Sequence, residues 1–215
     1  MIHIITPFSH PENLQFYLDN LKDKNVIWHP IFEASEFALK FIDSLDMDLG
    51  EYKPWGWIKP WVLGGITKDW FPNVDKCNNF IKNYSIIEDN DRYLFMNDDD
   101  WFEDNVFEQF KEENDPEDDV CFISMKRGFG QQPGYPNGHG TFTLMVDLDR
   151  VIVGNIGFEQ MCVKGRVLKQ MEFENHGCFD GLMAMKLHEQ YKVKPLYEVY
   201  ALFNYLEKGR WGIDK

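Results

Sequence analysis

The stretch Tyr93–Asn105, YLFMNDDDWFEDN, joins an apolar run to three consecutive aspartates. The apolar run YLFM, which with the preceding Arg92 reads RYLFM, is typical of a buried strand. Asp98, Asp99 and Asp100 follow it after Asn97, although adjacent carboxylates repel one another. In an open α/β sheet, ligands gather beyond the carboxyl ends of the strands. The stretch therefore predicts an α/β sheet with a charged site where one of its strands ends.

A simpler interpretation of the triplet stays open at this point. Acidic triplets also occur in solvated turns, and Asp100 or Asp104 could do no more than cap the helix expected from EDNVFEQF. On composition alone this interpretation is favoured. The apolar strand before the triplet and the aromatic pair Trp101-Phe102 after it favour a site instead.

The formal net charge of −14 is concentrated around this triplet. Residues 88–119 carry 15 acidic and two basic residues, a balance of −13, whereas the remainder carries 21 acids and 20 bases. Such a surface repels phosphates, and no basic stripe appears elsewhere. We therefore expect no nucleic acid partner.

Composition places the chain among globular proteins. Its 215 residues, 44% of them hydrophobic, are enough for one α/β domain with a sizeable core. No apolar run approaches the length of a membrane span, and the first residues show no signal peptide, so a cytoplasmic protein is expected. The four cysteines lie far apart without a CxxC, which argues against a zinc site or a disulfide framework.

Strands and helices alternate along the chain, which predicts a mainly parallel sheet with helices on both faces. Pro7 is expected to end the first strand, and Ser9 with Glu12 forms a capping box for the first helix. Ser35 is expected to cap the second helix. Strands are predicted at 2–6, 25–33, 92–96, 120–125, 141–149 and 194–207, and helices at 9–21, 34–45, 73–87 and 103–114. The stretch 173–191 leads into a further helix through Leu182, Met183 and Leu187.

The segment 50–65, GEYKPWGWIKPWVLGG, reads as a long loop with aromatic anchors. Its tryptophans, Trp55, Trp57 and Trp61, could stack on a sugar or could fill the core beneath the loop. Both interpretations stay open.

Three motifs in order, IITPFSHPENL, YLFMNDDDWFEDN and CFDGLMAMKL, resemble those of a glycosyltransferase of the GT-A fold, family 2. The resemblance covers most of the chain and implies a single domain over residues 1–215. A nucleotide-binding part would span about 1–105 and an acceptor-side part about 106–215. The sequence departs from the family pattern at Asn97, where some members have the first aspartate, and at Phe179, where an acid often stands.

The resemblance also implies roles for individual residues. Thr6 and Pro7 would lie against the base and ribose of the nucleotide, and Glu33 would lie near the base. Asp98 and Asp99 would contact the nucleotide.

A metal and a base are implied as well. Asp98 and Asp100, with His176 as a further candidate, would hold Mn²⁺ or Mg²⁺ on the diphosphate. Asp180 would be the general base that takes the proton of the acceptor hydroxyl.

The implied activity is the metal-dependent transfer of a sugar, with inversion, from a UDP- or GDP-linked donor to a glycan, lipid or small-molecule acceptor. A nucleotidyltransferase of similar fold is the first alternative, although TPFSHPEN lacks the glycine and lysine expected of a triphosphate loop. A non-catalytic acidic module that binds a metal or a protein is the second. Lys76 could meet a diphosphate, but a lone lysine is more often solvated.

Overall fold

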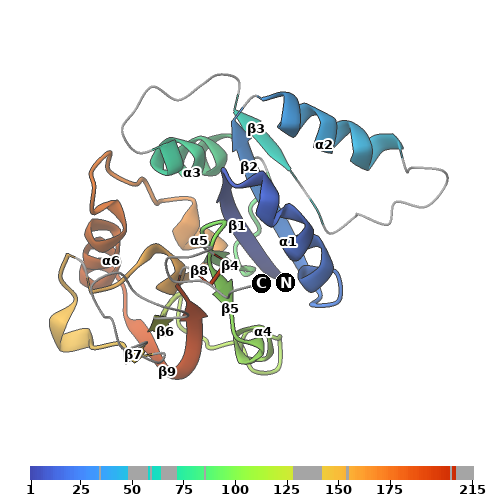
Figure 1. The fold of residues 1–215 in the computed structure, drawn as a ribbon. Helices are drawn as coiled ribbons and strands as arrows, with labels where there is room; N and C mark the ends of the chain where they lie inside the picture. Colours follow the sequence, from blue (N-terminus) through green and yellow to red (C-terminus); the bar gives the residue numbers. More distant parts are fainter. Residues whose placement is uncertain are drawn as a thin grey trace, which may run out of the picture.

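A nine-stranded sheet runs through the chain in the order β3-β2-β1-β4-β8-β6-β9-β5, with β7 beside β6 (Figure 1). The structure is a computed structural model. It describes residues 1–33, 35–47, 58, 60–63, 72–84, 86–127, 142–153, 155–203 and 205–206. The strands are β1 (Ile2–Phe8), β2 (Val26–Glu33), β3 (Trp61–Leu63), β4 (Arg92–Phe95), β5 (Trp101–Phe102), β6 (Val120–Arg127), β7 (Phe142–Leu144), β8 (Met161–Lys164) and β9 (Val193–Leu202).

The first half of the sheet is parallel, because β3, β2, β1 and β4 all run in the same direction. β6 and β9 are parallel to each other, whereas β8 runs antiparallel between β4 and β6. The expected α/β fold is confirmed. The antiparallel β8 brings the residues just before it to the edge of the sheet at which β4 ends.

Helices cover both faces of the sheet, as expected. One core packs under α1 (Leu14–Leu21), α2 (Glu36–Met47) and α4 (Asp104–Gln109). The other packs under α3 (Pro72–Asn83), α5 (Gly165–Leu168) and α6 (Phe179–Gln190). Alternate residues of one strand enter opposite cores, as Ile4 and Ile5 of β1 do. None of the helices in the described ranges is long and apolar enough to cross a membrane.

The start of the chain corrects two predictions. Pro7 does not end the first strand, since β1 continues to Phe8 beside β2. Its pairing with β4 stops at Ile5, and a proline is tolerated where one side of a strand is open. Ser9 does not cap the first helix, which begins with a 3-10 turn after His10. The cap by Ser35 is confirmed, because its hydroxyl accepts the Ala38 N–H at 3.1 Å.

The long loop expected at 50–65 contains the short strand β3. Trp55 and Trp57 lie outside the described residues, and so does the side chain of Trp61. Their two interpretations therefore stay open.

Candidate functional site

The aspartate turn, Asn97–Asp100, follows β4 at the carboxyl edge of the parallel strands. Its backbone closes on itself, as the Asp100 N–H donates to the Asn97 carbonyl at 3.2 Å. The Asn97 amide also donates to the Asp100 carboxylate at 2.9 Å. Asp98 and Asp100 are only 4% and 0% exposed, so a solvated turn is the wrong interpretation for these two acids.

The Asp98 carboxylate braces the loop that follows β1. It accepts hydrogen bonds from the backbone N–H groups of Ser9 and His10, the second at 2.6 Å. Its other oxygen lies 2.8 Å from Nδ1 of His10. Charge-assisted bonds of this kind are among the stronger ones in proteins. One acid of the triplet therefore fixes the β1 loop, which lies 89 residues away in sequence.

Helix α1 and the end of the described chain hold the aspartate turn from outside. The Tyr17 hydroxyl lies 2.8 Å from the Asp100 carbonyl and 3.0 Å from that of Asn97. The Asn13 amide donates to the Asp98 carbonyl at 2.7 Å, and the Leu206 N–H donates to that of Asp99 at 2.8 Å. Burial and the three nearby aspartates raise the pKa of Tyr17 well above its ordinary value, so its hydroxyl keeps its proton and can donate.

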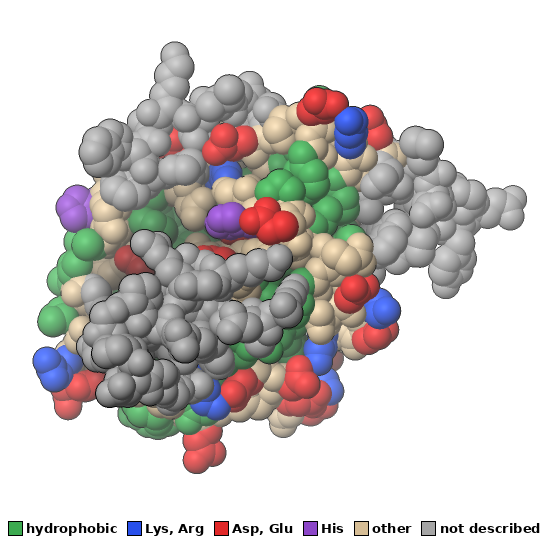
Figure 2. Space-filling view, viewed as in Figure 1, with side chains coloured by type: hydrophobic (Ala, Val, Ile, Leu, Met, Phe, Trp, Pro, Cys, Tyr) green, Lys and Arg blue, Asp and Glu red, His purple; other side chains and the backbone are tan. Residues whose placement is uncertain are grey.

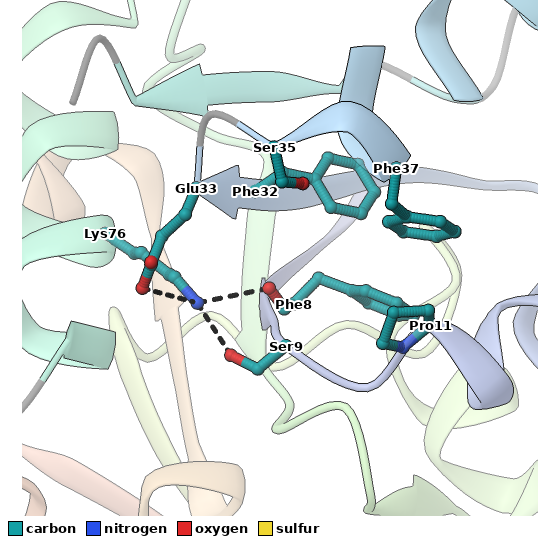
Figure 3. A pocket seen from close by; sticks show the side chains of 8 residues that line it. All are labelled: Phe8, Ser9, Pro11, Phe32, Glu33, Ser35, Phe37 and Lys76. Atoms are coloured by element: carbon teal, nitrogen blue, oxygen red, sulfur yellow. Dashed lines mark hydrogen bonds and ion pairs between the residues drawn. The ribbon is translucent and has the colours of Figure 1, made fainter. Parts of the chain in front are cut away.

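A pocket of about 310 Å³ opens beside this loop, where β1 and β2 end (Figure 3). The rings of Phe32 and Phe37 line one side, and Phe8 and Pro11 line the other. Four polar residues complete the lining: Ser9, Glu33, Ser35 and Lys76. Mostly apolar walls with a few converging polar groups are typical of a small-molecule site.

Lys76 of α3 reaches into this pocket and is 1% exposed. Its Nζ donates to the Phe8 carbonyl at 3.1 Å and to the Ser9 hydroxyl at 2.7 Å, and it lies 3.7 Å from Oε1 of Glu33. Burial lowers the pKa of Lys76, while the charges of Glu33 and Asp98 oppose that shift. The solvated lysine favoured from the sequence is therefore wrong. Lys76 is a buried cation of α3 that contacts the end of β1, the loop after it and the end of β2.

His10 sits at the outer rim of the same loop, with its side chain 49% exposed. Partial burial works against the charged imidazole, but the hydrogen bond and the charge of Asp98 outweigh it. The pKa of His10 is therefore raised. The β1 loop thus carries an imidazole whose charged form is favoured by Asp98.

Asp180 lies in the first turn of α6 and is half-buried. The preceding Phe179 packs in an aromatic cluster with Phe95, Phe158 and Phe173. Phe95 is the last residue of β4, and Phe158 belongs to the short turn before β8. The cluster thereby places the start of α6 at the edge of the sheet that carries the aspartate turn.

The remaining predicted residues have varied positions. Glu33 lines the pocket beside Lys76. The Thr6 hydroxyl is fully buried and accepts the Trp28 indole N–H at 3.0 Å, and Pro7 is buried within β1. His176 is exposed in the loop before α6, where its Nδ1 accepts the Cys178 N–H at 3.1 Å. The nucleotide contacts of Thr6 and Pro7 and the metal role of His176 stay predictions.

The oxygen atoms of the aspartate turn suit a hard cation such as Mg²⁺ or Mn²⁺. Three N–H donors already bond the Asp98 carboxylate, so its first role is to hold the loop. The described part of the chain brings together no group of three or more His, Cys, Asp or Glu side chains that could hold a metal. An ion at this turn would therefore depend on a substrate phosphate for further ligands, as Mg²⁺ often does.

Several residues of the site carried no sequence signal. Tyr17 and Asn13 read as ordinary residues of an amphipathic helix. The pocket rings, Phe8, Phe32 and Phe37, read as core. The sequence offered one clue. The predicted strand 2–6 ends three residues before Ser9, and the predicted strand 25–33 ends at Glu33.

The comparisons with known proteins add little to this picture. No family model matches the chain, and no curated protein matches it. Among solved structures it is similar to a crystal structure of a 4-diphosphocytidyl-2C-methyl-D-erythritol synthase, at 12% identity and a TM-score of 0.49. The match covers 92% of this chain and 88% of that chain. A likeness this distant carries no argument about activity or substrate.

Proposed function

We propose that the protein is a transferase that binds a nucleotide-linked substrate and moves a sugar from it to an acceptor hydroxyl. The observation that carries the proposal is the Lys76–Glu33 pair in an aromatic pocket. Ser9, which lines this pocket, also donates its backbone N–H to Asp98. Ser9 therefore lies between two features. The pocket could hold a flat polar ring, and the aspartate turn could hold a metal-bound diphosphate.

The pocket suits a nucleobase. Phenylalanine rings offer faces on which a base can stack. Glu33 can accept a hydrogen bond and Lys76 can donate one, so the pair matches adjacent donor and acceptor groups on the edge of a base. The ribose and diphosphate would then extend past Ser9 toward the aspartate turn.

Asp99 and Asp100 are the carboxylates we expect to hold Mg²⁺ or Mn²⁺ there, with Asp98 as the brace. When bound, the ion would neutralise charge on the leaving diphosphate. Asp180 would take the proton from the acceptor hydroxyl as that oxygen attacks the anomeric carbon from the face opposite the diphosphate, which inverts the carbon.

A nucleotidyltransferase is the second candidate, because the same pocket could hold the base of a nucleoside triphosphate. That reaction would need donors for a third phosphate. The amides of Ser9 and His10, the nearest such donors on the β1 loop, are already bonded to Asp98. This observation favours sugar transfer.

The first test is calorimetric titration with UDP and GDP, with and without Mn²⁺. We expect one nucleotide to bind, and only with the metal. Asp100→Asn should remove this binding. Asp180→Asn should keep the binding but lower transfer by about 10²–10⁴-fold, the usual contribution of a general base.

The reaction products separate the two candidates. Release of a nucleoside diphosphate from a nucleotide sugar supports sugar transfer, whereas pyrophosphate released from a nucleoside triphosphate and a sugar phosphate supports nucleotidyl transfer. A folded protein that binds neither UDP nor GDP would count against the proposal.

A further inference from the structure

Helix α3 touches two parts of the site through two side chains. Lys76 enters the pocket and bonds to the β1 loop. Two residues later, Asn78 pairs with both backbone groups of Phe173: its amide donates to the carbonyl at 2.8 Å, and the Phe173 N–H donates to its Oδ1 at 2.8 Å. Figure 1 shows the chain between α5 and α6 passing beside α3. This two-way amide pair cannot slide without losing both hydrogen bonds.

Phe173 in turn fixes the start of α6. Its ring is 2% exposed and lies 5.8 Å from the ring of Phe179, centroid to centroid, at an interplanar angle of 80°. Phe179 is the first residue of α6 and the direct neighbour of Asp180. A continuous series of contacts therefore runs from the pocket through Lys76, α3 and Asn78 to the helix turn that carries the expected base.

We propose that Asn78 is a positioning residue, and that it couples occupation of the pocket to the position of the first turn of α6. The inference rests on the proposed function, since it assumes that a nucleotide fills the pocket. A base that bonds to Lys76 or Glu33 competes with the contacts that Nζ now makes to Phe8, Ser9 and Glu33. Any resulting shift of α3 is passed to Phe173, because the amide pair and the packed rings join them.

The chain contains a natural reporter for this movement. Cys178 immediately precedes α6 and is half-buried, whereas the other three cysteines are fully buried. A thiol reagent should therefore modify Cys178 alone in the folded protein. We expect saturation with the nucleotide that binds, UDP or GDP with Mn²⁺, to change the Cys178 labelling rate by about threefold or more.

Asn78→Ala should still bind the nucleotide, with an affinity within about threefold of the parent protein, but should lose the change in labelling rate. Asn78→Asp has the same shape and keeps the acceptor for the Phe173 N–H. It places an oxygen against the Phe173 carbonyl, so we expect it to fold and to lose most of the response. Asn83→Ala is the matched control, because the exposed Asn83 amide on the same helix donates to the Asn79 carbonyl, at 2.9 Å, within one turn of α3. It should respond like the parent protein.

The outcomes separate the coupling from the proposed function. If the parent protein binds neither nucleotide, the proposed function fails and the coupling fails with it. If a nucleotide binds but the labelling rate of Cys178 does not change, the coupling is wrong and the proposed function stands. A change that persists in both Asn78 variants would reflect direct shielding of Cys178 by the ligand, and would also overturn the coupling.

Discussion

Two acidic regions of this chain are held in different ways. The aspartate turn, Asn97–Asp100, is fixed by amides, a tyrosine hydroxyl and an imidazole. The arginine-held loop, residues 115–119, is fixed by guanidinium groups. Arg92, 1% exposed, donates to the Asp115 carboxylate at 3.0 Å and to the carbonyls of Pro116 and Asp118 at 3.1 Å each.

The arginine-held loop is neutralised by the protein itself. Arg166 pairs with Asp119, and its hydrogen bond lowers the pKa of that carboxyl. Acidic side chains on the face seen in Figure 2 lie among lysines and arginines in a similar way. The charge of −13 over residues 88–119 therefore comes from acids with two different roles. The acids bonded to Arg92 and Arg166 serve the fold, whereas Asp99 and Asp100 at the edge of the sheet remain suited to a cation.

The largest effect we expect comes from Arg92→Met. It leaves the Asp115 carboxylate and three carbonyls, those of Pro116, Asp118 and Asp119, without their buried partner. The free energy of unfolding should fall by about 3–5 kcal/mol, as for other broken buried pairs, measured by urea denaturation. Nucleotide affinity of the folded protein should not change, because this loop lies outside the proposed site.

Lys111→Met is the control for Arg92→Met, because Lys111 lies just after α4 and its exposed side chain bonds to Glu108. It should leave the free energy of unfolding nearly unchanged, because an ion pair on the surface is screened by solvent. A loss of nucleotide binding in folded Arg92→Met would instead mean that the two acidic regions act together.

Tyr17→Phe tests the aspartate turn in the same way. The change removes only the hydroxyl that lies against the carbonyls of Asn97 and Asp100. We expect a loss of about 1–2 kcal/mol in the free energy of unfolding, the usual cost of a buried hydrogen bond. Unlike Arg92→Met, it should also weaken metal-dependent nucleotide binding, because the turn loses an anchor.

Tyr197→Phe is the control, since Tyr197 is 48% exposed, and it should change neither quantity. Unaltered nucleotide binding in Tyr17→Phe would show that the turn needs no anchor from α1.

The central strand and its acidic exit could be predicted because they are local. YLFM is apolar and is followed, after Asn97, by three aspartates, so one stretch shows both the end of the strand and the character of the turn beyond it. The short β8 escaped prediction for the opposite reason. Its four residues, MCVK, carry no alternation of their own, and only their partners on β4 and β6 make them a strand.

The contacts that build the site depend on register, which a single sequence does not contain. Ser9 meets Asp98 because β1 and β4 pair in parallel with Ile5 opposite Phe95. Lys76 stands in a helix with other polar residues, where nothing distinguishes it from a solvated lysine. Its role becomes visible only when α3 is laid over the ends of β1 and β2.

His10 should produce the smallest effect, and one that depends on pH. Its pKa is raised in the folded protein, so its bond to Asp98 adds stability that is fully present below its ordinary pKa. That stability is lost as the pH rises through the raised value. The difference in free energy of unfolding between the parent protein and His10→Gln should be largest below the ordinary pKa of histidine, about 6.5, and should disappear above the raised value. Because half of the imidazole is exposed, we expect less than about 1 kcal/mol, measured by urea denaturation across this range. A difference that did not vary with pH would mean that His10 holds Asp98 as a neutral donor. The aspartate turn would then carry more uncompensated negative charge than the arginine-held loop throughout the pH range of the measurement.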